Sequence, residues 1–173
     1  SYPKFALMPL VKNEWSDVNN SKVWKDLEEI TSDLSYITFS GGEPLLDKTH
    51  SSMLQYFINK QRSSYISLHY NTNATIFASN LIPLWSCFKE VELSFSIDNT
   101  GKKFEYERYG VSWKTIVDTI EKYKKVTDTV LNLNVWSTIT TLNILDTYTL
   151  FQFCREYGLT ISFNPLNNPK QLN

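Results

Sequence analysis

Three short polar segments follow apolar stretches of the sequence, and their residue types suit a ligand that joins an amino acid to a nucleoside. They are Ser40-Gly41-Gly42-Glu43-Pro44, Asn71-Thr72-Asn73 and Ser96-Ile97-Asp98-Asn99-Thr100-Gly101. Paired glycines let a ligand approach backbone amides and carbonyls closely. Carbonyl groups beside Glu43 suit a cationic ammonium. Each segment alone is also ordinary turn chemistry, but three at equivalent strand ends indicate a site.

Further polar residues suit the other parts of such a ligand. Ser96 and Arg108 are candidates for binding a carboxylate, which arginine holds in bidentate fashion. Amide and carboxylate side chains suit ribose hydroxyls and the neighbouring groups of such a ligand. The candidates for this role are Asn71, Asn73, Asp98 and Asn134. The sequence has no Gly-x-Gly-x-x-Gly and no Gly-Lys-Ser, so these segments do not form a phosphate loop.

The elements that must position these residues alternate along the chain. Short alternating stretches predict strands over 36–40, 67–71, 91–97, 131–137 and 160–163. Helical spacing predicts helices near 24–34, 53–58, 80–88, 113–120 and 143–157, the last ending at Gly158. Residues 5–10 are a candidate sixth strand. Strands separated by helices predict parallel βαβ units, with residues 1–21 as an irregular N-terminal segment and 22–173 as one domain.

The predicted strands have one apolar and one polar face. A closed (β/α)8 barrel fills its interior with Val, Ile and Leu, whereas unpaired buried polar groups cost about 1–3 kcal/mol each. We therefore predict an α/β fold, a partial (β/α)6-type TIM barrel of parallel strands truncated at both ends, with a wet lumen. His69, Glu92 and Asn164 are expected to line this lumen beside a substrate. The alternative is a one-sided sheet whose polar face meets solvent.

The same segments resemble motifs of radical S-adenosylmethionine (radical SAM) enzymes. Residues 38–46 (TFSGGEPLL) resemble the Gly-Gly-Glu-Pro motif of that family. Residues 70–75 are similar to its Thr-Asn-Gly-Thr segment with Ala74 in place of Gly, and residues 94–98 resemble its Ser-x-Asp-Gly strand with Asn99 in place of Gly. Residues 104–110 followed by Trp113 resemble the twitch-domain subgroup, as do 142–144 and 163–166. The resemblance covers roughly residues 22–172 in the family's order.

This resemblance implies S-adenosylmethionine as cofactor, with Gly41, Gly42 and Glu43 at its methionine ammonium. It also implies a [4Fe-4S] cluster, an external electron donor, a 5′-deoxyadenosyl radical and hydrogen abstraction from a substrate, with a peptide or protein as one candidate. The family holds its cluster on Cys-x3-Cys-x2-Cys, and this sequence has no such motif. We therefore expect this chain to bind no metal and to contain no catalytic residue of its own. Either the cluster loop lies before Ser1 in a longer protein, or it has been lost.

Composition narrows the possible partners. Seventeen basic and eighteen acidic residues give a net charge of −1, so nucleic-acid or membrane binding is not expected. The only two cysteines, Cys87 and Cys154, do not form a disulfide framework and suit a reducing cytoplasm. We expect both thiols to be buried, and His50 to be solvated near a helix start.

Two functional hypotheses follow from these patterns. The first is the central part of a radical SAM enzyme of the twitch-domain type. The second is a degenerate barrel without redox chemistry that binds a nucleoside, a peptide or a protein partner. A three-cysteine loop encoded upstream of Ser1 favours the enzyme, and its loss favours the binding module.

Overall fold

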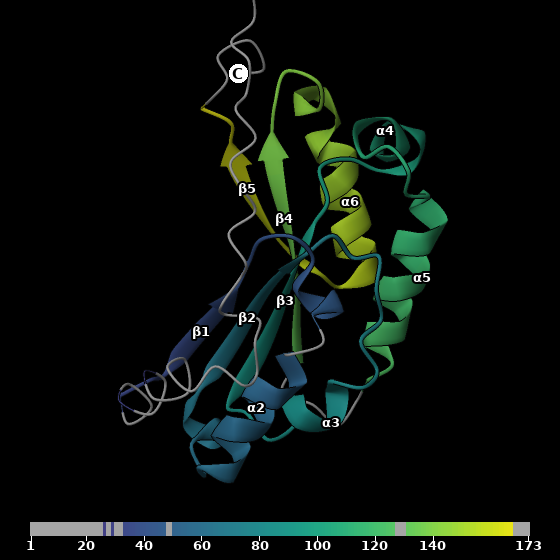
Figure 1. Cartoon of the computed structure of the whole chain (residues 1–173). Helices are drawn as coiled ribbons and strands as arrows, with labels where there is room; N and C mark the ends of the chain where they lie inside the picture. Colours follow the sequence, from purple (N-terminus) through teal and green to yellow (C-terminus); the bar gives the residue numbers. More distant parts are fainter. Residues whose placement is uncertain (1–25, 27–28, 30–32, 48–49, 127–130, 168–173) are drawn as a thin grey trace, which may run out of the picture.

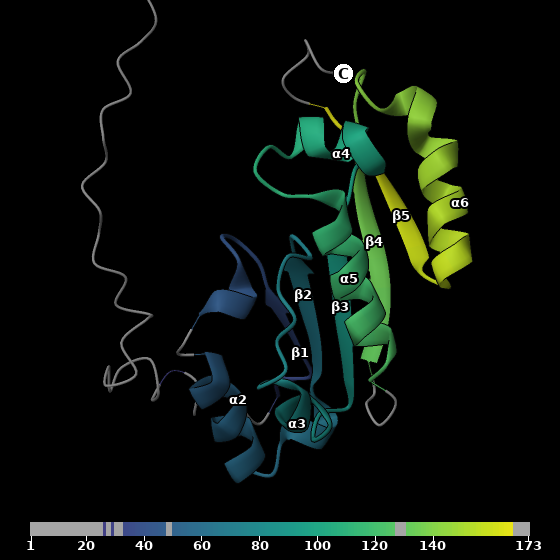
Figure 2. The ribbon, with the colours of Figure 1, turned by 90° about the vertical axis from the view of Figure 1, so that its right-hand side faces the viewer.

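The computed structural model describes residues 26, 29, 33–47, 50–126 and 131–167. They form one sheet, with the labelled helices gathered on one side of it (Figures 1 and 2). The segment 1–21 and the candidate strand over 5–10 lie outside the described residues, as does most of the helix expected near 24–34.

The sheet contains five parallel strands in the order of the sequence, β1-β2-β3-β4-β5. Consecutive parallel strands joined by crossovers are the arrangement of a partial barrel, as the sequence predicts. All five carboxyl ends meet at one edge, where a fold of this kind binds ligands. The strands are β1 (Tyr36–Phe39), β2 (Ser67–Thr72), β3 (Glu90–Ser96), β4 (Leu131–Ile139) and β5 (Thr160–Pro165).

Four of the five expected helices are present among the described residues, and one additional helix appears. Gly158 ends the last long helix with a left-handed φ of 64°, as predicted. The helix not expected from the sequence is α4, which carries Arg108 at its C-terminal end. The helices are α2 (His50–Asn59), α3 (Ile82–Trp85), α4 (Gly101–Glu107), α5 (Trp113–Lys124) and α6 (Thr147–Tyr157), with 3-10 turns η2 (Pro44–Leu46), η3 (Ser63–Tyr65) and η4 (Ile144–Asp146).

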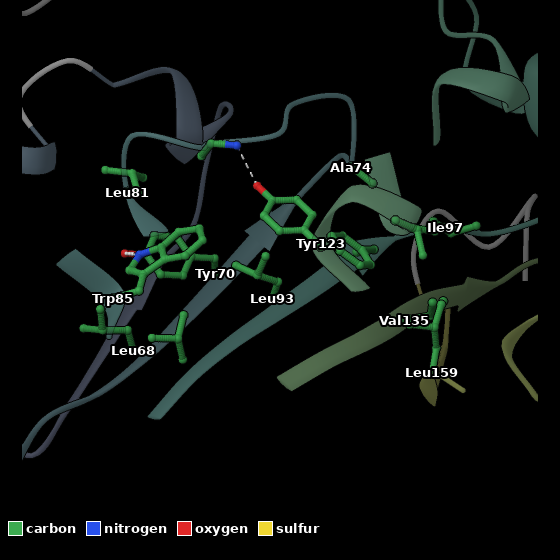
Figure 3. Close-up of a cluster of buried hydrophobic side chains, with 14 of the residues drawn as sticks. Leu68, Tyr70, Ala74, Leu81, Trp85, Leu93, Ile97, Tyr123, Val135 and Leu159 are labelled. Atoms are coloured by element: carbon green, nitrogen blue, oxygen red, sulfur yellow. Dashed lines mark hydrogen bonds between the residues drawn. The ribbon is translucent and has the colours of Figure 1, made fainter. Parts of the chain in front are cut away.

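The apolar strand residues pack beneath the helices. Leu68, Leu93 and Phe95 are almost completely buried in one cluster. Trp85 of α3 and Tyr123 of α5 belong to the same cluster, and Figure 3 shows them beside Leu68 and Leu93. This confirms the predicted strand register, because a shift by one residue would turn these side chains to the other face.

The opposite face is polar, with exceptions near the β5 edge. Trp136 lies on the polar face and is 43% exposed, whereas Phe163 lies on the apolar face and is 39% exposed. Cys154 is buried as expected, but Cys87 is exposed, so that prediction was wrong for Cys87. Cys87 follows Ser86, the C-cap of the short helix α3, at the surface. Among the described residues, no helix has the length and apolar character needed to cross a membrane.

Candidate cofactor-binding site at the carboxyl ends of the strands

A hollow of about 740 Å³, here called the Gly-Gly hollow, lies where β1 ends. The Ser40–Pro44 segment forms much of its wall. Gly41 and Gly42 have φ angles of 89° and 59°, a region that L-residues rarely adopt. A Cβ atom built on either glycine would find no heavy atom within 4 Å. The glycine backbone is therefore accessible to a ligand, as the motif predicts.

Glu43 ties this loop to the next strand. One carboxylate oxygen accepts from the Thr72 hydroxyl at 2.8 Å and from the Leu45 N–H at 3.2 Å. The other oxygen accepts from the Asn73 N–H at 2.9 Å. These contacts hold the ends of β1 and β2 together. The carboxylate thus has a structural role in addition to the expected one beside a ligand ammonium.

The segment after β2 is held by local and long-range hydrogen bonds. The Asn73 side-chain oxygen accepts from the Thr75 N–H at 2.9 Å and from its hydroxyl at 2.5 Å. Ala74 has a left-handed φ of 61°, which explains why glycine suits this position. The Tyr123 hydroxyl accepts from the Ala78 N–H, the dashed line at Tyr123 in Figure 3. It donates to the Ile76 carbonyl. Burial raises the pKa of Tyr123 to about 12, so it remains a neutral anchor.

Asp98 and Arg108 contact each other at the ends of β3 and α4. The Arg108 Nε and Nη2 atoms both donate to Asp98 Oδ2, at 3.1 and 2.6 Å. Asp98 Oδ1 accepts from the Thr138 N–H at 2.7 Å. A second hollow, of about 390 Å³, lies beside Asp98 and Thr138. Arg108 is not among the residues that line the Gly-Gly hollow.

The remaining predicted residues lie on the polar face or at its edge. His69 Nε2 lies 2.9 Å from Ser94 Oγ, and Asn134 Nδ2 donates to Ser94 Oγ and to Glu92 Oε1, both at 3.3 Å. Thr160 then donates to Asn134 Oδ1 at 3.1 Å, which extends this row from β2 to β5. Asn71 and Ser96 are half-buried on the same face, and Asn164 is exposed on the edge strand. That this face borders a substrate remains a prediction.

His50 corrects one expectation. It is 5% exposed, and its Nε2 lies 2.7 Å from the Tyr70 hydroxyl, which accepts from Trp85 Nε1 at 3.0 Å. In the tautomer with an unprotonated Nε2, His50 accepts the Tyr70 proton while the Tyr70 oxygen accepts from Trp85. Burial lowers the pKa of His50 to about 4, against a smaller opposing effect of Asp47. His50 is therefore neutral and forms part of the wall of the Gly-Gly hollow.

Two buried asparagines complete the edge of the site, and neither received a site role from its sequence. Asn99 and Asn143 are each 1% exposed. Asn99 donates to Glu107 at 3.0 Å, and Asn143 donates to the carbonyls of Asp98 and Thr138 at 3.2 and 2.8 Å. Two features of the sequence could have indicated a role for them: both follow predicted strands, and both lie among residues that resemble family motifs.

No protein-family model and no curated protein sequence matches the chain. Solved structures of other proteins do match it. SuiB of Streptococcus suis bound to S-adenosylmethionine has a TM-score of 0.65 and 16% identity, over 88% of this chain and 36% of SuiB. AnSMEcpe with bound AdoMet and Kp18Cys peptide has a TM-score of 0.66 and 14% identity, over 83% of this chain and 42% of anSMEcpe.

The chain shares its fold with these proteins, which are radical SAM enzymes. This agrees with the fold class that the strand pattern and the motifs predict. SuiB without ligand gives the same result, with a TM-score of 0.66 over 88% of this chain and 35% of SuiB. The chain thus spans roughly two fifths or less of the length of these proteins.

Proposed function

We propose that this chain is the S-adenosylmethionine-binding part of a radical SAM enzyme of the twitch-domain type. One observation carries the proposal: the Gly41–Gly42 backbone faces open space in the hollow at the end of β1, while Glu43 is held behind it. The SAM-bound structures of SuiB and anSMEcpe support it through their shared fold.

The residues present fit this cofactor. Gly41 and Gly42 offer backbone carbonyls and amides to its amino-acid end, flanked by Ser40 and Pro44, and Glu43 supplies negative charge near an ammonium. Arg108 and Ser96 suit its carboxylate, whereas Asn71, Asn73 and Asn134 are the candidates for ribose and neighbouring groups; Asp98, the fourth candidate from the sequence, lies beside Arg108. When bound, the cofactor supplies a sulfonium whose reductive cleavage yields a carbon radical. The chain's own residues bind and orient it.

The residues present do not fit a [4Fe-4S] cluster. The sequence has two cysteines, and one is exposed after α3 while the other is buried on α6. No group of three His, Cys, Asp or Glu side chains in the described ranges could hold a metal ion. We therefore assign the cluster, the external electron donor and catalysis to a longer protein, and a peptide in the lumen is its proposed substrate. The two unpaired thiols remain our reason for proposing the cytoplasm as its compartment.

A second candidate is a barrel without redox chemistry that binds a nucleoside or a partner. The two-cysteine composition favours it. Such a nucleoside-binding module would bind 5′-methylthioadenosine as tightly as S-adenosylmethionine, because the former retains adenine and ribose but has no amino-acid end. Calorimetric titration of the full chain with both ligands separates the candidates. The enzyme proposal requires tighter binding of S-adenosylmethionine.

Replacing Gly42 by alanine should lower the affinity for S-adenosylmethionine about tenfold, which corresponds to about 1.4 kcal/mol. The added Cβ would project into the space where the ligand approaches the backbone. The matched control is Gly158→Ala, because Gly158 has a φ of 64° and equally open surroundings but caps α6. Both variants bear similar backbone strain, so only ligand affinity should separate them. Equal affinities in titration calorimetry would reject the assignment of the Gly-Gly backbone.

A further inference from the structure

Asp98 was assigned to ribose on sequence grounds, but its contacts point to another role. Its two oxygens are already engaged, one by two Arg108 nitrogens and the other by the Thr138 backbone N–H. The Asp98 carbonyl is held as well, because the buried Asn143 amide bridges it to the Thr138 carbonyl. Asp98 is therefore fixed against β4 before any ligand arrives.

The same contacts leave one edge of the Arg108 guanidinium open. Asp98 occupies the side formed by Nε and Nη2, using a single oxygen. Arginine has five N–H groups, and the other three find no acceptor within the described part of the chain. The Arg108 side chain is 32% exposed, so ligands have access to it. The edge formed by Nη1 and Nη2 matches a carboxylate in bidentate fashion.

We infer that Asp98 is a positioning residue that orients Arg108 toward the carboxylate of the amino-acid part of the ligand, and that it does not bind the ribose. The inference rests on the proposed function. If the arginine side chain is mobile and must be ordered when the ligand binds, the affinity for the ligand falls by up to about thirtyfold. Repulsion between Asp98 and a ligand carboxylate in water and salt costs only a few-fold. Orientation therefore outweighs repulsion.

Loop geometry supports the same role. Asn99, next to Asp98, donates to Glu107, the neighbour of Arg108. The segment after β3 is thus fastened to the end of α4 at two adjacent positions. Because α4 ends at Glu107 and Arg108 caps it, this double attachment fixes the residue from which the guanidinium extends.

The test compares two ligands, S-adenosylmethionine and 5′-methylthioadenosine, by titration calorimetry on the full chain. Asp98→Asn keeps the acceptor for the Thr138 N–H but cannot hold both Arg108 donors. It should lower the affinity for S-adenosylmethionine about tenfold and change that for 5′-methylthioadenosine less than twofold. Arg108→Ala should give the same pattern, and the double variant should be no worse than Arg108→Ala alone. The matched control is Asp118→Asn, since Asp118 pairs with Lys114 on the surface of α5.

Three other outcomes would overturn either the role of Asp98 or the proposed function. Equal losses for the two ligands in Asp98→Asn would place Asp98 at the ribose or in a purely structural role and overturn the inference. Tighter binding of S-adenosylmethionine by Asp98→Asn would show that repulsion dominates, with the same consequence. If the unaltered chain binds S-adenosylmethionine no more tightly than 5′-methylthioadenosine, the proposed function itself fails. An affinity ratio between ligands is unaffected by a general loss of stability, which thermal unfolding of each variant measures separately.

Discussion

Acidification from pH 7 to pH 4 should destabilise the fold by about 3 kcal/mol through His50 alone. Burial lowers the pKa of this imidazole from 6.5 to about 4. The unfolded chain therefore takes up a proton at His50 as the pH falls through 6.5, whereas the folded chain does not until about pH 4. The contribution of His50 is fully present above pH 6.5 and is lost between 6.5 and 4.

The measurement is urea unfolding of the parent chain and of His50→Gln at pH values from 7 to 4. Carboxylates titrate in both proteins, so the difference between their free energies of unfolding isolates His50. Glutamine is uncharged, and its amide oxygen accepts from the Tyr70 hydroxyl. The difference should change by about 3 kcal/mol across this range and stay level above pH 7.

Tyr70→Phe tests whether burial or the hydrogen bond to Tyr70 causes the lowered pKa of His50. It removes the hydroxyl that lies 2.7 Å from His50 and leaves Trp85 Nε1 without that acceptor, so the protein should be less stable at every pH. The pH dependence should remain, because burial is the main cause of the lowered pKa. Equal pH dependence in the parent chain and His50→Gln would show that the ring is solvated, as its sequence position suggested.

The strands and their buried faces were predictable because period-2 alternation is a local property of the sequence. Leu93 and Phe95 alternate with Ser94 and Ser96, and the structure buries the first pair in the core. Gly158 was predictable for the same reason, since a left-handed residue after an amphipathic stretch ends a helix. The helix α4 was not predicted, because Phe104 is its only buried residue and gives no apolar period.

The places of the candidate residues in the fold could be predicted in part, but their contacts could not. Local composition indicates that Glu43 and Asp98 lie directly after predicted strands, whereas the place of Arg108 at the end of α4 was not predicted. It does not reveal that Glu43 contacts residues 29 and 30 positions later in the chain. Such pairings depend on how far β1 and β2 extend at the carboxyl edge of the sheet. His50 was misjudged for a related reason: its burial comes from Phe39 and Tyr70, on two different strands.

Glu43→Ala should destabilise the chain by roughly 3 kcal/mol, which lowers the melting temperature by roughly 6–12 °C for a domain of this size. The carboxylate accepts from Thr72, Asn73 and Leu45, and hydrogen bonds to a charged group contribute about 1.5–3 kcal/mol each. The site is half-buried, so the lower end of that range applies to the Thr72 and Asn73 bonds, whereas the Leu45 bond is local and longer, at 3.2 Å, and is left out of the sum. Glu43→Gln should fall between the parent and alanine, because its amide nitrogen cannot accept from Asn73.

Glu156→Ala is the matched control, since Glu156 is an exposed residue of α6, and its melting temperature should stay within about 1 °C of the parent. Thermal unfolding followed by circular dichroism measures all three variants. Glu43→Ala should also lose affinity for S-adenosylmethionine, because the Gly-Gly backbone is then no longer fastened to β2. A Glu43→Ala chain that melts like the parent but fails to bind the cofactor would make Glu43 a ligand contact only. The fastening of β1 to β2 would then have to come from the strand pairing itself.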